Sequence, residues 1–273
     1  MRILFIGDVV GKPGRDVVTA ELPRLIERLK LDFVILNGEN AAHGFGLTRA
    51  IANDFFALGV DCITTGNHWA DQREILNFIA DEDRVLRPRN LPAGAPGKGA
   101  NLFQARNGQN VLVVSPLGRV FMEPQDDPFA AVDSELNACP LGEAADAIVV
   151  DMHAEATSEK MAMGHFCDGR ASMVVGSHQH IPTGDAQILP GGTAYQTDAG
   201  ACADYDSVIG MDKFEPLNRF TRKLPGNRFT PATGPATLCA VFVETNAKGL
   251  AARIDPVRVG GRLKQTIPEN LTG

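Results

Sequence analysis

Short, mostly apolar runs that stop at a glycine or a polar residue recur along the chain. Runs of this kind are typical of strands that are buried on both faces of a sheet. They occupy residues 3–6, 33–36, 60–65, 147–150 and 173–175. The pattern therefore predicts five buried strands.

Apolar residues at helical spacing separate the first three strands. They predict helices over residues 15–30 and 48–58, with Thr48 as the N-cap of the second. We expect Pro23 to bend or break the first helix, because proline lacks an amide hydrogen. Strand, helix and strand in this order form a βαβ unit with parallel strands and a right-handed crossover. The chain is therefore predicted to belong to the α/β class.

Antiparallel elements are expected in the second half. Turn signals predict one hairpin from residues 101–105 and 111–115 and a closing hairpin from residues 237–244 and 251–259. Periodicity also predicts helices over residues 71–80, 129–139 and 161–170.

Two stretches lack a clear periodic pattern. Residues 87–99 are rich in proline and glycine, and we interpret them as a break between two pseudo-halves of one domain that spans residues 1–273. Residues 207–233 are expected to form an irregular connection, which at this length usually serves function or an oligomer contact. A homo-oligomer is therefore possible.

The composition places the chain among ordinary globular proteins, with 44% hydrophobic and 22% charged residues. A net charge of −7 without any basic run argues against binding to duplex nucleic acid. No apolar run approaches the length of a membrane span. The five cysteines are scattered and never form a C-x-x-C pair, as is usual in a reducing compartment. We therefore expect a cytoplasmic protein without membrane contact.

Polar residues follow the first three predicted strands. Asp8 follows the first, Glu39 and Asn40 the second, and Asn67 and His68 the third. Ligand sites of open parallel α/β sheets lie outside the carboxyl ends of the strands. The same polar residues also occur as helix caps and in turns, so each alone is ambiguous.

Histidines follow the two later strands. His153 comes after residues 147–150, and His178 and His180 come after residues 173–175. Residues i and i+2 of an extended chain share a side, so we expect the last two imidazoles to face one point. The alternatives are a hydrogen-bonded surface histidine in that pair and a satisfied buried histidine at position 153.

Imidazole, carboxylate and amide oxygen without thiolate suit iron, manganese or zinc. The candidate ligands are too many for one ion: Asp8, Glu39, Asn40, Asn67, His153, His178 and His180. Two ions about 3.5–4 Å apart, bridged by a carboxylate, would use all of them and form a clamp for phosphoester hydrolysis. His43 is either a substrate contact or an exposed loop residue, and His165 and Asp198 are expected to be structural.

The order of these motifs resembles that of the dinuclear calcineurin-like metallophosphoesterases. The matching segments are Gly7-Asp8, Asn37-Gly38-Glu39-Asn40, Gly66-Asn67-His68, His153 and Gly176-Ser177-His178-Gln179-His180. Residues 6–15 and 36–46 are in particular similar to the YmdB-like phosphodiesterase branch. The resemblance implies a four-layer α/β/β/α sandwich of mixed sheets, with the metal site at the carboxyl ends of the strands.

The resemblance also implies a role for each ligand. It places Asp8, Asn40 and His180 on one metal, Asn67, His153 and His178 on the second, and Glu39 as the bridge. Two positions depart from the broad family: Val10 stands in place of a histidine ligand, and Trp69 in place of the acid after the Asn-His pair. The hydrogen-bonding partner of His68 must therefore come from elsewhere.

The implied activity is hydrolysis of cyclic nucleotides, with 2′,3′-cyclic nucleoside monophosphates favoured. A hydroxide that bridges the metals would attack phosphorus, and His68 would act as general acid for the leaving oxygen. A phosphomonoesterase is the nearest alternative. A regulatory or scaffold protein with a vestigial metal site is the alternative from another class.

Overall fold

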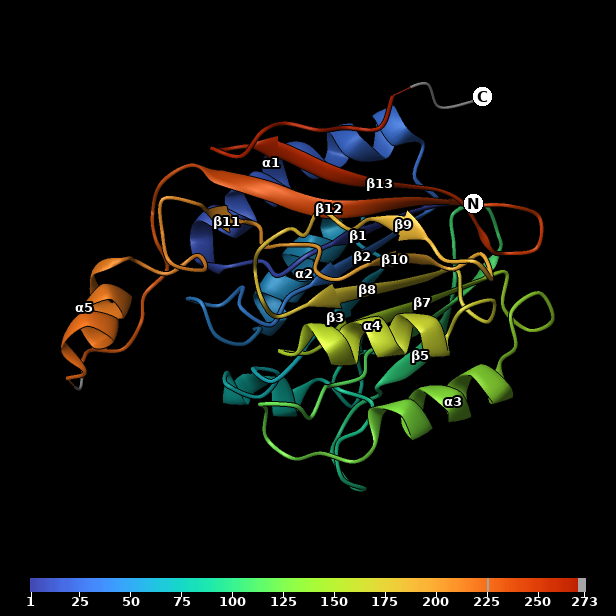
Figure 1. Cartoon of the computed structure of the whole chain (residues 1–273), viewed down its shortest axis with the longest axis horizontal. Coiled ribbons are helices and arrows are strands. Elements are labelled where there is room, and N and C mark those ends of the chain that lie inside the picture. The colour runs from blue at the N-terminus through green and yellow to red at the C-terminus, as the bar shows by residue number, and fades with distance from the viewer. Residues whose placement is uncertain (225, 270–273) are drawn as a thin grey trace.

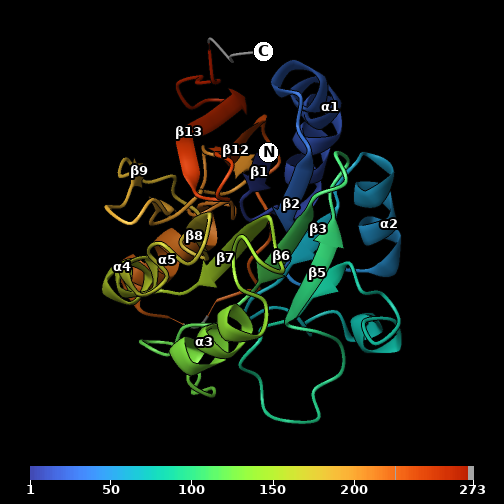
Figure 2. The same ribbon diagram turned by 90° about the vertical axis from the view of Figure 1, so that its right-hand side faces the viewer.

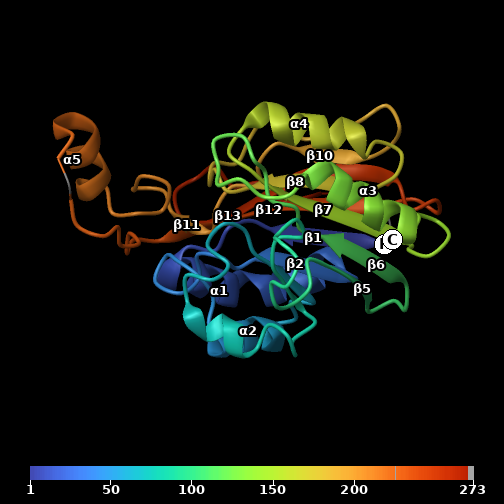
Figure 3. The same ribbon diagram turned by 90° about the horizontal axis from the view of Figure 1, so that it is seen from below.

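The computed structural model describes residues 1–224 and 226–269, which form four layers. Figures 2 and 3 show helices on both outer sides of the molecule and the strands between them. The outer helices are α1 (Gly11–Leu29) and α2 (Arg49–Ala57) on one side, and α3 (Pro128–Ala138) and α4 (Thr157–Phe166) on the other. This arrangement confirms the predicted α/β/β/α sandwich.

The first sheet has seven strands and combines parallel and antiparallel pairs. Its order is β11-β12-β1-β2-β3-β4, and β13 pairs with β12. Strands β1 to β4 are parallel, whereas β12 runs antiparallel to β1, β11 and β13. The bounds are β1 (Arg2–Ile6), β2 (Phe33–Asn37), β3 (Cys62–Thr64), β4 (Val85–Leu86), β11 (Ala203–Asp204), β12 (Ala236–Thr245) and β13 (Ala251–Gly260).

The second sheet has six strands in the order β5-β6-β7-β8-β10-β9. Its middle strands β6, β7, β8 and β10 are parallel, and both edge strands are antiparallel to their neighbours. The bounds are β5 (Ala100–Gln104), β6 (Asn110–Val114), β7 (Ala147–His153), β8 (Met173–Ser177), β9 (Gln187–Ile188) and β10 (Ala194–Gln196). The chain passes from the first sheet to the second through residues 87–99.

The buried strands are apolar except near their carboxyl ends, because each of their faces contacts a different layer. In β1, Leu4 and Ile6 pack in the cluster beneath α1 and α2, whereas Ile3 and Phe5 pack in the cluster between the sheets. Strand β7 repeats this alternation toward α3 and α4. Both predicted hairpins are confirmed, by the β5–β6 and β12–β13 pairs.

Pro23 was predicted to bend or break the first helix, and the structure shows that it does not break it. Helix α1 runs continuously through Pro23 and begins at Gly11, four residues earlier than predicted. Leu22 and Leu25 are buried on either side of the proline. Burial of this apolar face outweighs the one lost hydrogen bond.

The helices predicted over residues 71–80 and 161–170 are displaced. The first is only a 3₁₀ segment, η1 (Arg73–Asn77), because Gln72 has an extended backbone and its side-chain amide donates to the carbonyl oxygen of Phe45 at 2.9 Å. The second is α4, which begins at Thr157 and ends at Phe166.

The prediction that residues 207–233 are irregular is also wrong, because they contain α5 (Phe214–Arg222). Figures 1 and 3 show this helix standing away from the four layers. Phe214 and Phe220 are 77% and 79% exposed, so the helix does not bury its apolar side chains as α1 does. Phe214, Leu217 and Phe220 nevertheless recur at helical spacing, so the sequence carries a periodic signal for this helix that the prediction for residues 207–233 did not take into account.

In the part of the chain that the structure describes, no helix has the length and apolar character required to cross a membrane.

Phe33 is buried between the sheets and Phe220 is exposed, so their replacement by alanine should affect stability very differently. Phe33→Ala should lower the free energy of unfolding by about 3–5 kcal/mol, because Phe33 is fully buried and the change leaves a cavity. The control Phe220→Ala on α5 should change it by less than about 0.5 kcal/mol. Urea unfolding followed by circular dichroism measures both, and equal losses would contradict the layer assignment.

Candidate metal centre

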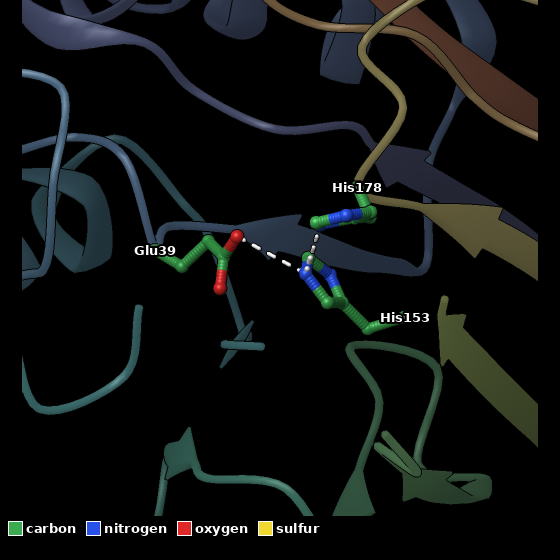
Figure 4. A group of neighbouring side chains, drawn as sticks. All are labelled: Glu39, His153 and His178. Atoms are coloured by element: carbon green, nitrogen blue, oxygen red, sulfur yellow. Dashed lines mark hydrogen bonds and ion pairs between the residues drawn. The ribbon is translucent and has the colours of Figure 1, made fainter. Parts of the chain in front are cut away.

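The carboxyl ends of parallel strands from both sheets meet at one place. Glu39 follows β2, His153 ends β7, and His178 follows β8. Figure 4 shows the three side chains pointing toward one another, and their nearest ligand atoms all lie within 4.8 Å of one another. They form the first group of the candidate metal centre.

Nε2 of His153 is surrounded by other potential ligands. It lies 3.1 Å from Oε1 of Glu39, 2.9 Å from Oδ1 of Asn67 and 3.2 Å from Nδ1 of His178. One imidazole nitrogen carries at most one hydrogen and cannot donate to all three.

Ser177 shows which nitrogen of His153 carries the proton. The Ser177 hydroxyl donates to Oδ1 of Asp151 at 2.6 Å, so it accepts from Nδ1 of His153 at 2.8 Å. In the neutral ring Nε2 is then an acceptor that faces further acceptors. This concentration of lone pairs fits a bound cation, and Asp151 and Ser177 orient the ring as the outer partners of metal ligands do.

A second group of acceptors lies around His180. Its Nδ1 donates to the carbonyl oxygen of Ile209 at 2.7 Å, and Nδ2 of Asn40 donates to the carbonyl oxygen of Gly44 at 2.9 Å. The remaining atoms, Nε2 of His180 and Oδ1 of Asn40, face each other at 3.3 Å. Oδ1 of Asp8 lies 3.9 Å from the same Nε2. Two facing acceptors beside a buried carboxylate also fit a cation.

Charge in this centre is strongly perturbed by burial and by neighbouring groups. Burial raises the pKa of Asp8 to about 6, although His180 and His153 act in the opposite direction. For Glu39, burial is outweighed by His153 and His68, and the pKa falls to about 2. Burial and then His153 lower the pKa of His178 to about 3. Glu39 is therefore ionised and His178 neutral at pH 7, as metal ligation requires.

His153 differs from His178 because Glu39 lies beside it. Burial opposes its protonation, but the Glu39 carboxylate outweighs burial and raises the pKa to about 9. A cation bound at this position would take the place of that proton.

His68 lies at the edge of the centre. Since Trp69 stands in place of the usual acid, His68 needs another hydrogen-bonding partner, and Asp71 is that partner. Its Nδ1 lies 2.9 Å from Oδ2 of Asp71, and its main-chain nitrogen donates to Oε2 of Glu39 at 3.0 Å. The ring packs edge-on against Phe45. An acid three residues after a histidine was the available sequence signal for this pair.

The expectation that His178 and His180 face one point from an extended backbone is wrong. Strand β8 ends at Ser177, and the two residues have φ angles of 93° and 66°, in the left-handed region. His178 turns to His153 and also lies 3.1 Å from Oε2 of Glu155. His180 turns to Asn40 instead. The main-chain nitrogen of His178 contacts both carboxylate oxygens of Asp8, at 3.3 and 3.2 Å.

Lys160 is a residue of this region that the sequence did not single out. Its Nζ lies 2.8 Å from Oδ2 of Asp198, and neither side chain is exposed. Asp198 was expected to be structural, and it accepts a hydrogen bond from the main-chain nitrogen of Gln179, between the two histidines. A lone lysine in a helical pattern gives no signal of such a contact.

A cavity of about 1030 Å³ opens over the centre. Its polar part includes Glu39, Asn40, His68, His178 and His180, and its apolar part includes Phe45, Ile209, Met211 and Phe229. His43 is exposed and is not one of the residues that line this cavity. Its substrate contact stays a prediction.

Comparisons with known proteins point to one family. The family model described as YmdB-like protein matches residues 4–257. The chain is 50% identical over 247 residues to a 2′,3′-cyclic-nucleotide 2′-phosphodiesterase of Bacillus subtilis (strain 168), which covers 89% of this chain and 91% of that protein.

Two solved structures have the same fold over nearly their full lengths. A hypothetical protein from Thermus thermophilus is 44% identical with a TM-score of 0.89, covering 96% of this chain and 100% of the other. A structure described as a novel phosphatase from Mycoplasma pneumoniae is 30% identical with a TM-score of 0.88, covering 95% and 93%.

The geometry of the first group predicts that His178→Ala loses bound metal. Removal of one imidazole from a buried site costs affinity that the remaining ligands do not restore, so the metal content per chain should fall by about half or more. Elemental analysis of protein purified without oxygen measures this content. His165→Ala, an exposed histidine on α4, is the matched control and should keep the full content. Full metal content in His178→Ala would remove His178 from the centre.

Proposed function

This chain belongs to the YmdB-like protein family, and from that membership we propose that it is a metal-dependent phosphodiesterase that hydrolyses 2′,3′-cyclic nucleoside monophosphates. The observation that carries the proposal is the convergence of acceptor atoms from Glu39, His153 and His178 beside the cavity, which Glu39 and His178 line. The 50% identity to a protein named for this activity supports the substrate class.

The two groups of acceptors support two metal positions. Asn67, His153 and His178 would hold one ion, Asp8, Asn40 and His180 the other, and Glu39 would bridge them. Nitrogen and oxygen donors without thiolate favour iron or manganese, with zinc as a further possibility. When bound, such ions supply an activated water and neutralise charge on the phosphoryl oxygens.

His68 is the proposed general acid. The Asp71 carboxylate accepts the Nδ1 proton of His68 and thereby fixes the orientation of the ring. Nε2 then carries the second proton, which can pass to the ribose oxygen that leaves phosphorus. The hydrogen bond from the main-chain nitrogen of His68 to Glu39 holds this acid at a fixed place beside the centre.

The cavity supports a nucleotide more than a small phosphate alone. Its volume of about 1030 Å³ lies at the upper end of the range typical of small-molecule sites. Phe45 and Phe229 in its wall offer aromatic surface, which suits a flat base. A phosphate placed among the ligands leaves this apolar part free for the nucleoside.

We also propose a cytoplasmic location and hydrolysis of monoesters as the second candidate activity. All five cysteines are free, and four of them are buried, which suits a reducing compartment. The monoesterase candidate rests on the structural relative described as a phosphatase.

Substrate preference separates the two candidate activities. We expect kcat/KM for a 2′,3′-cyclic nucleoside monophosphate to exceed that for the corresponding 3′-monophosphate by at least about 100-fold, since the cavity accepts the diester and His68 protonates an alkoxide. Steady-state rates on both substrates with the metal-loaded protein provide the comparison. A clear preference for the monoester would reject the phosphodiesterase.

The role of His68 predicts a turnover defect without metal loss. His68→Ala should lower kcat by about 10²- to 10⁴-fold, the usual contribution of a general acid, while the metal content stays constant. Asp71→Asn should lower kcat less, because the acid remains and only the contact that orients its ring is weakened. Stopped assays combined with elemental analysis test both variants. Retained turnover in His68→Ala would exclude it as the acid.

A further inference from the structure

A fully buried ion pair lies behind the segment that carries His178 and His180. It consists of Lys160 on α4 and Asp198 after β10, with Nζ and Oδ2 separated by 2.8 Å. Removal of two charges from water costs about as much as their attraction returns, so such a pair is weak evidence for stability. We therefore ask which neighbouring groups the ion pair between Lys160 and Asp198 holds in place.

Two of the three other hydrogen bonds that these two side chains make go to Gln179. Nζ of Lys160 donates to Oε1 of Gln179 at 3.0 Å. Oδ2 of Asp198 accepts from the main-chain nitrogen of Gln179 at 3.0 Å, and Oδ1 accepts from that of Gly200 at 2.8 Å. The backbone and the side chain of Gln179 are thus held by the same ion pair.

The contact with Lys160 decides which way the Gln179 amide faces. An ammonium has donors only, so the amide atom beside it must be the oxygen. Nε2 is then the free end, on a half-buried side chain that lines the cavity. Among the residues that the structure describes, none accepts a hydrogen bond from this nitrogen. The ammonium also polarises the amide and makes Nε2 a stronger donor.

The surroundings indicate which part of a substrate would accept this hydrogen bond. The cavity wall beyond Gln179 contains Thr183, Asp185 and Thr197. Oδ2 of Asp185 accepts the hydroxyl of Thr197 at 2.5 Å, so this wall carries a carboxylate. Negative charge disfavours a phosphate there, whereas a neutral nucleoside with hydrogen-bonding edges is compatible with it.

We propose that Gln179 binds the nucleoside part of the substrate by donating a hydrogen bond from Nε2, and that Lys160 and Asp198 are positioning residues that fix its amide for this contact. The inference rests on the proposed cyclic-nucleotide substrate and adds a specificity residue to it. Neither the metal ligands nor His68 take part.

The first test replaces the amide by an apolar side chain of similar size. In Gln179→Leu, kcat/KM for 2′,3′-cyclic AMP and 2′,3′-cyclic GMP should fall by about 10-fold relative to kcat/KM for bis(4-nitrophenyl) phosphate, a diester without a nucleoside. The loss should appear in KM, and metal content should stay at that of the unchanged protein. An unchanged ratio, or a loss of metal, would overturn the proposal.

Gln187→Leu is the matched control. Gln187 lines the same cavity, but its Nε2 already donates to the carbonyl oxygen of Asp185 at 3.3 Å. The substrate ratio should therefore stay within about twofold of that of the unchanged protein. An equal fall in this variant would assign the effect to the polarity of the cavity rather than to Gln179.

A double-mutant cycle tests the positioning role of Lys160. Lys160→Met should lower the same substrate ratio alone and cause no further fall in the Gln179→Leu background, because it acts through Gln179. Since Lys160→Met leaves Asp198 buried without its partner, the cycle is repeated with Lys160→Met/Asp198→Asn, which removes both charges. Additive effects in both cycles would show that the ion pair does not act through Gln179.

A binding measurement separates this inference from the proposed function. Calorimetry measures the Kd of a nucleoside 3′-monophosphate and of inorganic phosphate for the metal-loaded protein, without turnover. Gln179→Leu should weaken the nucleotide by about 10-fold more than phosphate. If the unchanged protein hydrolyses no cyclic nucleotide but shows this difference, the proposed function fails and the Gln179 contact stands. Equal weakening of both ligands would reject the contact.

Discussion

Acceptor atoms that face one another at about 3 Å are the constraint on which this structure depends. Nε2 of His153 faces Glu39 and Asn67, and Nε2 of His180 faces Asn40. Hydrogen bonds on the far side of both rings and of the Asn40 amide hold these lone pairs in place, so the groups cannot satisfy one another while both rings are neutral. Only positive charge between them relieves the arrangement. The unfavourable contact between these acceptors is confined to the candidate metal centre, and the packing of the rest of the fold holds the acceptors together.

The four layers explain how the chain maintains this arrangement. One ligand group combines Glu39 and Asn67, which follow strands of the first sheet, with His153 and His178, which lie at the ends of strands of the second sheet. The apolar cluster between the sheets fixes their spacing and thereby the distance between Glu39 and His153. Helices α1 and α4 cover the outer faces and exclude water from the strands. Packing that lies well away from the centre therefore determines its geometry.

The residue pattern was sufficient for the buried strands and both hairpins, and the resemblance to a known family supplied the four layers, but neither gave the contacts that orient the candidate ligands. Strand ends in α/β proteins meet at one edge, which is why Asp8, Glu39 and His153 could be placed together from spacing alone. Spacing gave the wrong backbone for His178 and His180, because their left-handed conformation depends on hydrogen bonds to Asp8 and Asp198. Lys160 and Asp151 act through tertiary contacts that leave no local pattern. Pro23 was misjudged because the gain from packing outweighed local propensity, whereas the signal for α5 was present in the spacing of Phe214, Leu217 and Phe220.

The contact between His180 and Ile209 has a different kind of consequence. The proton of His180 is directed by a main-chain oxygen, so the identity of the side chain at position 209 does not matter for it. Because a main-chain atom makes this contact, the side chains alone do not reveal it. Insertions or deletions between β11 and α5 are what would remove it. The contact therefore depends on the backbone path between β11 and α5, which presents the carbonyl oxygen of Ile209 to His180.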